Sequence, residues 1–438
     1  MRIFLRDFKI QGVKNLKAPI ELTFANKEVK SFDELDNNVK AIYGPNGSGK
    51  TAIIYALSTL KYVLMNPNFL QDSQTLRTLA TLLNKESESI DFHLNFFAEV
   101  SKGKILLYTY ETQIKYAQGR FFLNREKYSY RAHEYAKENI LLKTEHGKIV
   151  EQFPNEVTDR EFLNLLDKSS FLSLLGERVF VHEDVSGLEE FVPLIAPFFT
   201  FAERLLAILD TRDTKFTLFF RKREEHLKEA HMFSDIITSA ASLHEDRFNF
   251  RRIHRDELAL YKQTLKQKEA FLKIFKPNIK RLSYEKKLVL ARGDNEYYDV
   301  NEYIEYEHYK IDLELESVGI KKIYDLFDVL KRLNNGAILA LDELDTHIND
   351  VYLVKLIEYV MKYAKGQLIF TTHNASPMDL LKTKKNALDF LSISGTLTPW
   401  TQIGNYSPAN VYHRGMIKKL PFNVTAESFI GVFTSDAK

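Results

Sequence analysis

The sequence contains no cysteine and no long apolar run. Zero cysteine among 438 residues excludes disulfides, thiolate metal sites and cysteine nucleophiles, and it fits a reducing compartment. No stretch reaches the roughly 18 apolar residues that a membrane helix needs. Charges interrupt residues 1–12, where a secretory signal would need an apolar core. We therefore expect a cytoplasmic protein without a membrane partner.

The sequence also lacks an excess of positive or negative side chains. The chain carries 61 basic and 59 acidic side chains, for a formal net charge of +2. This balance gives no long-range attraction to nucleic acid or to an anionic membrane, so any such contact must come from a local patch. The 438 residues are enough for two or three folding units with sizeable cores.

Glycine is scarce and unevenly placed. The 17 glycines are about 4% of the residues, against roughly 7% in typical soluble domains. Gly44, Gly47 and Gly49 lie close together, whereas the stretch between Gly187 and Gly293 contains none. A cluster of glycines after a strand indicates a loop that wraps phosphates. We expect the glycine-free stretch to form several packed helices.

The glycine cluster is a complete GxxxxGK[ST] motif, the phosphate loop: Gly44, Pro45, Asn46, Gly47, Ser48, Gly49, Lys50 and Thr51. Residues 39–43 alternate like a strand and residues 51–63 have helical spacing, which is the strand–loop–helix context that this motif requires. Lys50 is expected to neutralise the β- and γ-phosphates of ATP. Thr51 is expected to place its hydroxyl on Mg²⁺.

Two further apolar runs end in polar side chains. Residues 337–341 lead directly into Asp342 and Glu343. Residues 367–372 lead into His373. Continuous apolar runs predict buried parallel strands, whose carboxyl ends hold ligands in α/β sheets. We expect Asp342 to bind Mg²⁺, Glu343 to activate the attacking water, and His373 to contact that water or the γ-phosphate.

These motifs resemble those of a known family. The phosphate loop, the segment ALDELDTHIN and the strand QLIFTTHN look like the ABC-type ATPase heads of the SMC and RecF group. The strongest resemblance is to the stand-alone AAA/ABC-like ATPases of bacterial antiphage defence, which include abortive-infection, PARIS, Septu and OLD-like ATPases without Toprim. The resemblance implies an α/β fold: an ABC-type P-loop head with a split, mixed sheet, an antiparallel β subdomain and an inserted α-helical domain.

The spacing of the motifs sets the expected domain organisation. Lys50 and Asp342 stand so far apart in the sequence that a large insertion must separate the two halves of one nucleotide site. By resemblance, residues 1–130 form the first half of the head and residues 131–280 the helical insertion. Residues 281–438 form the second half, with the signature, Walker B, D-loop and H-loop segments and a short tail.

The resemblance also assigns residues that act across a dimer. Residues 315–322 look like a degenerate signature, in which Ser317 and Gly319 would cap the γ-phosphate bound to the opposite subunit. Asp345 looks like the D-loop residue that couples the two sites. Lys14 takes the place of the nucleotide-contacting arginine of the family.

Two assignments stay open. The Q-loop glutamine of the family has two candidates, Gln113 and Gln118. One helical face of the expected insertion carries four arginines: Arg247, Arg251, Arg252 and Arg255. This face is either a contact for phosphate, nucleic acid or an acidic partner, or a solvated face that neighbouring acidic side chains neutralise.

The resemblance implies a dimerising ATPase, a sensor and switch in antiphage defence that controls a separately encoded toxic effector such as a nuclease. Its expected cofactors are ATP and Mg²⁺, and its partners a second copy, the effector, and DNA or a phage component. The signature lacks one glycine of its usual pair, so turnover is expected to be slow. Residues 374–438 are too short for a Toprim nuclease domain. The alternatives are a RecF/SMC-like DNA-repair ATPase and a slow-turnover, nucleotide-bound scaffold.

Overall fold

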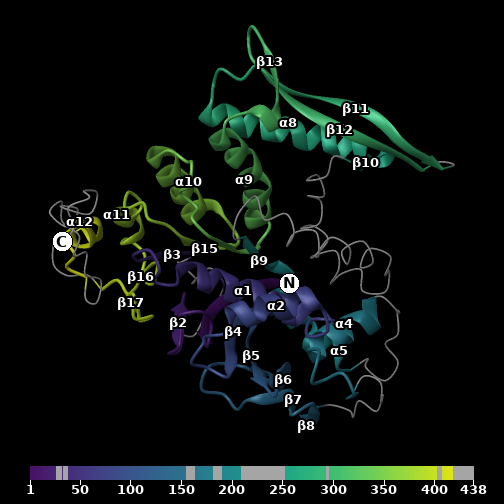
Figure 1. Ribbon diagram of the computed structural model, residues 1–438, viewed down its shortest axis with the longest axis vertical. Helices are drawn as coiled ribbons and strands as arrows, with labels where there is room; N and C mark the ends of the chain where they lie inside the picture. The colour runs from purple at the N-terminus through teal and green to yellow at the C-terminus, as the bar shows by residue number, and fades with distance from the viewer. Residues whose placement is uncertain are drawn as a thin grey trace, which may run out of the picture.

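The computed structural model describes residues 1–25, 32, 38–153, 163–180, 190–208, 252–292, 295–401 and 407–417. In these residues the chain forms three β-sheets with helices packed on and between them (Figure 1). The predicted α/β class is confirmed. No helix in this described part is long and apolar enough to cross a membrane.

The central sheet carries the expected site strands. Its six strands follow the order β17-β16-β3-β15-β14-β9. They are β3 (Val39–Tyr43), β9 (Leu205–Ile208), β14 (Ile338–Leu341), β15 (Gln367–Thr371), β16 (Leu388–Leu391) and β17 (Leu397–Pro399). All neighbouring pairs are parallel except β16 and β17. Every residue of β3, β14 and β15 is buried because both faces of the sheet are covered.

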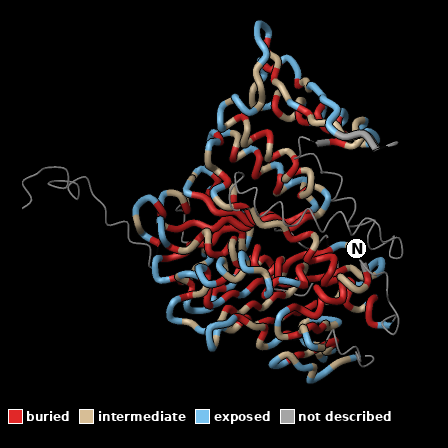
Figure 2. Tube along the Cα trace, turned by 45° about the vertical axis from the view of Figure 1, so that its right-hand side comes forward, coloured by how far each residue is buried: buried red, intermediate tan, exposed pale blue. Residues whose placement is uncertain are grey.

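Helices cover the central sheet on both sides. One face packs with α1 (Lys50–Met65), α4 (Phe171–Phe180) and α5 (Val192–Arg204) into a large core shared with the antiparallel sheet. The other face packs with α9 (Val318–Asn334), α10 (Asp350–Tyr363) and α12 (Pro408–His413). Two further helices, α2 (Ser73–Leu82) and α11 (Met378–Leu381), add buried residues to the first and the second of these cores. Figure 2 shows the buried residues concentrated in these layers.

A seven-stranded antiparallel sheet lies beside the central sheet, in the order β2-β1-β4-β5-β6-β7-β8. Its strands are β1 (Arg2–Gln11), β2 (Ile20–Thr23), β4 (Ser89–Ser101), β5 (Lys104–Ala117), β6 (Arg120–Arg131), β7 (Asn139–Glu145) and β8 (Lys148–Gln152). One face is apolar and packs on α1, α4 and α5. This sheet is the expected antiparallel β subdomain.

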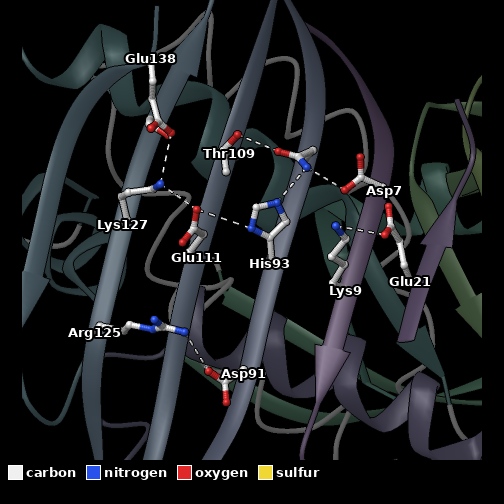
Figure 3. A network of polar contacts seen from close by, with 12 residues as sticks. Asp7, Lys9, Glu21, Asp91, His93, Thr109, Glu111, Arg125, Lys127 and Glu138 are labelled. Atoms are coloured by element: carbon white, nitrogen blue, oxygen red, sulfur yellow. Dashed lines mark hydrogen bonds and ion pairs between the residues drawn. The ribbon is translucent and has the colours of Figure 1, made fainter. Parts of the chain in front are cut away.

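The other face of the antiparallel sheet carries a ladder of paired polar side chains (Figure 3). Glu111 lies 3.6 Å from His93 and 2.7 Å from the Lys127 ammonium on the neighbouring strands. The hydrogen bond from His93 is the main reason that the pKa of Glu111 falls to about 2. The charged side chains on this face pair with one another. The opposite, apolar face of the sheet packs into the core.

The expected helical insertion at 131–280 is partly wrong. Residues 139–152 form β7 and β8, which extend the antiparallel sheet through a tight turn. His146 (φ 50°) and Gly147 (φ 72°) both adopt positive φ there, as a two-residue hairpin turn requires. Further on, α5 and β9 belong to the head, since β9 pairs in parallel with β14. The sequence pattern does not reveal these strands because they are short and their buried and exposed residues do not alternate regularly.

A third sheet and a long helix stand away from the rest of the molecule (Figure 1). We call this part, residues 252–292 and 295–315, the arm. It contains β10 (Arg252–His254), α8 (Leu258–Phe275), β11 (Arg281–Arg292), β12 (Asn295–Glu305) and β13 (Lys310–Asp312), with 3-10 turns at Arg255–Glu257 and Leu313–Leu315. A buried ion pair of 2.7 Å between Lys268 of α8 and Asp328 of α9 fixes the arm to the head.

Candidate active site

The three site segments meet at one edge of the central sheet. β15 lies between β3 and β14, and all three strands are parallel, so their carboxyl ends lie side by side. The phosphate loop follows β3, Asp342 follows β14, and His373 follows β15. The structure thus brings together residues that are almost three hundred positions apart in the sequence.

The phosphate loop curls in a way that two of its glycines make possible. A Cβ atom on Gly44 would lie 2.3 Å from the carbonyl oxygen of Leu391. Gly49 has φ 104°, and a Cβ atom there would lie 2.3 Å from Oδ1 of Asn15. The loop leads into α1, whose first turn has no acidic residue and no side-chain cap. The open N–H groups of that turn suit an anion.

Lys50 lies over its own loop. Its Nζ donates hydrogen bonds to the carbonyl oxygens of Gly44 (2.8 Å) and Pro45 (3.1 Å). Burial lowers the pKa of Lys50, whereas the charges of Asp342, and then of Glu343 and Asp345, oppose that shift. The ammonium therefore lies within electrostatic reach of the Walker B carboxylates, where the phosphates of a nucleotide would bind.

A turn before the phosphate loop in sequence supports it in space. Nδ2 of Asn15 donates hydrogen bonds to the carbonyl oxygens of Gly47 (3.1 Å) and Ser48 (2.7 Å). Lys14, with φ 49°, holds its Nζ 4.1 Å from the ring centroid of Tyr55 in α1. Burial lowers the pKa of Lys14, and Asp342 opposes the shift. Lys14 thus lies within electrostatic reach of Asp342, and its contact with a nucleotide stays a prediction. The role of Asn15 was missed because no local pattern marks it.

A threonine of the next strand binds the Asp342 carboxylate and the backbone of Glu343. The hydroxyl of Thr371 donates to Oδ1 of Asp342, and its oxygen accepts the N–H of Glu343 at 2.8 Å. Thr346 also donates its hydroxyl to Oε2 of Glu343 at 3.3 Å. Sequence reasoning missed Thr371, since its function depends on the pairing of β15 with β14.

His373 lies at the same edge, on the exposed side. Partial burial and the neighbouring Lys50 ammonium lower the pKa of His373, and the carboxylates, with Asp345 foremost, oppose this. A lowered pKa keeps the imidazole neutral at pH 7, when it has one donor and one acceptor nitrogen. The following residue, Asn374, donates to Oδ1 of Asp350 in α10 at 2.7 Å and so anchors the loop.

The signature and D-loop segments lie against each other. Ser317 caps α9, where its Oγ accepts the N–H of Ile320 at 3.4 Å, and its side chain is exposed. A Cβ atom on Gly319 would lie 3.0 Å from the carbonyl oxygen of His347 in the D-loop. Oδ1 of Asp345 is buried without a hydrogen-bond partner among the described residues.

The remaining candidates that the structure describes are not brought to the site. Arg252 lies in β10 and Arg255 in the 3-10 turn after it, 3.7 Å from Glu296, so the expected single helical face is wrong for these two. Arg247 and Arg251 lie outside the described residues. Both glutamine candidates belong to the antiparallel sheet. Gln113 donates to Oδ1 of Asp91 at 2.7 Å, and Gln118 lies in the turn between β5 and β6 with φ 52°.

The donor set suits Mg²⁺ bound together with a nucleotide. Among the described residues no cluster of three or more His, Cys, Asp or Glu side chains could hold a metal alone. Mg²⁺ usually takes one or two protein oxygens, several waters and the substrate phosphates. The Thr51 hydroxyl and the Asp342 carboxylate match this, since Thr371 engages only Oδ1 of Asp342 within the described structure.

Comparison with known proteins identifies a family. The model of a family described as "AAA domain, putative AbiEii toxin, Type IV TA system" matches residues 40–379. That range contains the phosphate loop, both Walker B carboxylates and His373. The comparison with curated proteins gave no match.

Several solved structures are similar to the chain at low identity. One is the Smc head domain of Pyrococcus furiosus with an extended coiled coil, bound to the C-terminal domain of ScpA, at 13% identity over 91% of this chain and 96% of that chain (TM-score 0.42). Another is the Smc head domain of Pyrococcus yayanosii with a coiled coil and joint, at 11% identity over 91% and 98% (TM-score 0.41). A third is the recombination mediator RecF with ATP, at 13% identity over 91% and 99% (TM-score 0.35).

Proposed function

The chain belongs to the family of AAA domains of the AbiEii type, and from this premise we propose that it is an ATP-hydrolysing switch that acts in antiphage defence. The observation that carries the proposal is the meeting of the phosphate loop, Asp342, Glu343 and His373 at the ends of three adjacent parallel strands. This is the arrangement that in-line attack of water on a γ-phosphate needs.

Each side chain has a defined part in the reaction. Lys50 leaves the carbonyl oxygens of its own loop for the phosphates, because a phosphate anion is the stronger partner for an ammonium. Glu343 accepts the proton of the attacking water, and neutral His373 orients that water or the γ-phosphate. Mg²⁺, held by Thr51 and Asp342, would neutralise charge on the β- and γ-phosphates.

A second copy would complete the site. Ser317 is exposed at the N-terminus of α9, where backbone N–H groups point outward. Such a terminus can bind the γ-phosphate held by another subunit. Asp345, with a buried and unpartnered oxygen, would find its partner in the same interface. ATP binding would join two heads, and hydrolysis would release them.

The switch would control a separately encoded toxic effector protein. We expect this effector to be a nuclease. The arm, which stands away from the head and is joined to the signature helix α9 by Lys268 and Asp328, offers such a partner a surface that is linked to the nucleotide state. DNA or a phage component is the expected trigger.

The first test is Glu343→Gln in the purified protein. We expect hydrolysis to fall about 100-fold or more, because the amide cannot accept the proton of water, while ATP stays bound. The control is Glu358→Gln, on the outer side of α10 between Lys355 and Lys362, which should hydrolyse at the wild-type rate. Equal rates for Glu343→Gln and the wild type would refute the base assignment.

Two further outcomes separate the alternatives. A wild-type protein that retains ATP for hours without releasing phosphate would favour the nucleotide-bound scaffold over the enzyme. In cells that carry the chain with its neighbouring genes, Lys50→Ala and Glu343→Gln should both abolish protection in a phage plating assay. Full protection by both variants would refute an ATP-dependent role in defence.

A further inference from the structure

Thr371 is the last residue of β15 and one of the most completely buried polar residues of the chain, with 0% of its surface exposed. β15 pairs in parallel with β14 through the neighbours Leu341 and Phe370. This register sets Thr371 beside the point where β14 ends and the Walker B carboxylates begin. A threonine in this position is not explained by packing, because its hydroxyl could be replaced by a methyl group without a change of shape.

Thr371 binds three consecutive residues after β14. Its hydroxyl donates to Oδ1 of Asp342, its oxygen accepts the N–H of Glu343 at 2.8 Å, and its carbonyl oxygen accepts the N–H of Leu344 at 3.1 Å. A hydroxyl has one proton, so donation to Asp342 leaves a lone pair for the N–H of Glu343. The two hydrogen bonds of the hydroxyl therefore fix the Asp342 carboxylate and the Glu343 backbone at the same time.

The backbone of Glu343 needs such support. Its φ of 45° lies in the left-handed region, which is unfavourable for a residue with a long side chain. The hydrogen bonds of the Glu343 and Leu344 N–H groups to Thr371 hold this turn in place. The direction of the Glu343 side chain follows from the turn, since a relaxed φ would rotate the carboxylate away from the position it now has.

We propose that Thr371 is a positioning residue for ATP hydrolysis, whose hydroxyl locks the Mg²⁺-binding carboxylate of Asp342 and the general base Glu343 into one rigid unit. This inference rests on the proposed function. In this proposal Thr371 contacts neither the attacking water nor the nucleotide. It acts through Asp342, which would hold Mg²⁺, and through Glu343, which would activate the water. Loss of the hydroxyl would free the Asp342 carboxylate and, at the same time, the backbone turn that directs the Glu343 side chain.

The test compares Thr371→Val with Thr371→Ser. Valine keeps the shape and removes both hydrogen bonds, whereas serine keeps the hydroxyl. Residues that orient metal ligands typically contribute 10- to 100-fold to activity or metal affinity. We therefore expect kcat of Thr371→Val to fall about 10- to 100-fold, and kcat of Thr371→Ser to stay within about threefold of wild type.

A second readout does not depend on turnover. The fluorescence of a labelled ATP analogue, titrated with Mg²⁺, reports how tightly Mg²⁺ joins the bound nucleotide. For Thr371→Val we expect the Mg²⁺ midpoint to rise about tenfold, with nucleotide affinity in EDTA unchanged. The matched control is Thr109→Val, which removes another buried threonine hydroxyl, from the polar ladder of the antiparallel sheet, and should change neither quantity.

The double variant Glu343→Gln with Thr371→Val separates the effect of Thr371 on the general base from its effect on Mg²⁺ binding. Once the base is gone, removing Thr371 should lower the residual rate little further, but it should still raise the Mg²⁺ midpoint. Wild-type kcat and Mg²⁺ midpoint in Thr371→Val, or equal damage by valine and serine, would overturn the inference. A wild-type protein without ATPase activity would refute the proposed function instead, and the Mg²⁺ midpoint would still test the link from Thr371 to Asp342.

Discussion

Asn15 supports the phosphate loop from outside, and its contribution to nucleotide binding can be measured directly. Its amide holds the carbonyl oxygens of Gly47 and Ser48, which fixes the direction of the neighbouring N–H groups. Two hydrogen bonds of about 0.5–1.5 kcal/mol each predict that Asn15→Ala weakens ATP binding by about 5- to 150-fold. Equilibrium titration with a fluorescent ATP analogue measures this change. Asn139→Ala, at an exposed strand residue, is the control, and equal affinities would contradict the role of Asn15.

Residues that act through a local motif could be predicted from the sequence, and residues that act across elements could not. Lys50 and Thr51 are identified by neighbours within the same eight residues, because the phosphate loop is a local backbone structure. Asn15 and Thr371 are identified only by contacts with segments 28 or more positions away. An isolated asparagine or threonine has no periodicity that would single it out.

Among the elements, α4 begins at an unusual buried carboxylate. Oε2 of Glu126 in β6 accepts the N–H of Phe171, the first residue of α4, at 2.9 Å. Its Oε1 accepts the hydroxyls of Tyr110 (2.7 Å) and Tyr128 (2.8 Å). Burial raises the pKa of Glu126 from 4.5 to about 7, although these three donors oppose the shift. The antiparallel sheet is thus joined to α4 by a group that titrates near neutral pH.

This pKa predicts how the stability of the fold depends on pH. The folded value is above the unfolded one, so the contribution of Glu126 is complete below pH 4.5 and is lost as pH rises through about 7. The shift corresponds to about 2–3 kcal/mol between pH 5 and pH 8. Urea unfolding should show that the stability of wild type relative to Glu126→Gln decreases by that amount over this range. Glu151→Gln, on the exposed side of β8, should show no such change, and a pH-independent difference for Glu126→Gln would refute the assignment.

Element types were predictable where both faces of a segment share one environment. Three strands are buried on both faces and therefore appear in the sequence as apolar runs: β3, β14 and β15. For this reason the sequence predicted each strand and the site motif that follows it. β7 and β8 lack a regular alternation of buried and exposed residues and have only seven and five residues, too few to distinguish a period of two from a helical pattern. The register of β7 comes from pairing with β6 and that of β8 from pairing with β7, which a single sequence does not encode locally.

At the scale of the whole molecule, the nucleotide site is a product of chain topology. The phosphate loop lies between β2 and β4 of the antiparallel sheet in sequence, and the Walker B strand follows the arm. Because β15 inserts between β3 and β14, neither half of the central sheet can form a site alone. The site therefore forms only when both halves of the sheet meet. The arm is inserted in the sequence between β9 and β14, so it interrupts no strand of the central sheet.

The same topology leaves Ser317 on the surface, and this exposure leads to a prediction about assembly. In the Glu343→Gln variant with Mg²⁺ and ATP, we expect two copies to associate, with the molecular mass in sedimentation equilibrium doubling relative to the nucleotide-free protein. Ser317→Asp in that background adds a negative charge beside the γ-phosphate of the opposite subunit, and should weaken association at least about tenfold. Aspartate caps a helix as well as serine does, so α9 itself should remain intact.

Asparagine at the same position separates charge from shape. Ser317→Asn has nearly the size of the aspartate variant, caps α9 equally well and carries no charge. We expect this variant to dimerise with ATP close to the strength of the parent protein, so that the difference between the two substitutions measures repulsion by the γ-phosphate. That difference should shrink when ADP replaces ATP, since the γ-phosphate is then absent. Equal dimerisation of the aspartate and asparagine variants with ATP would show that Ser317 does not face a nucleotide, and the signature assignment would then have to be abandoned.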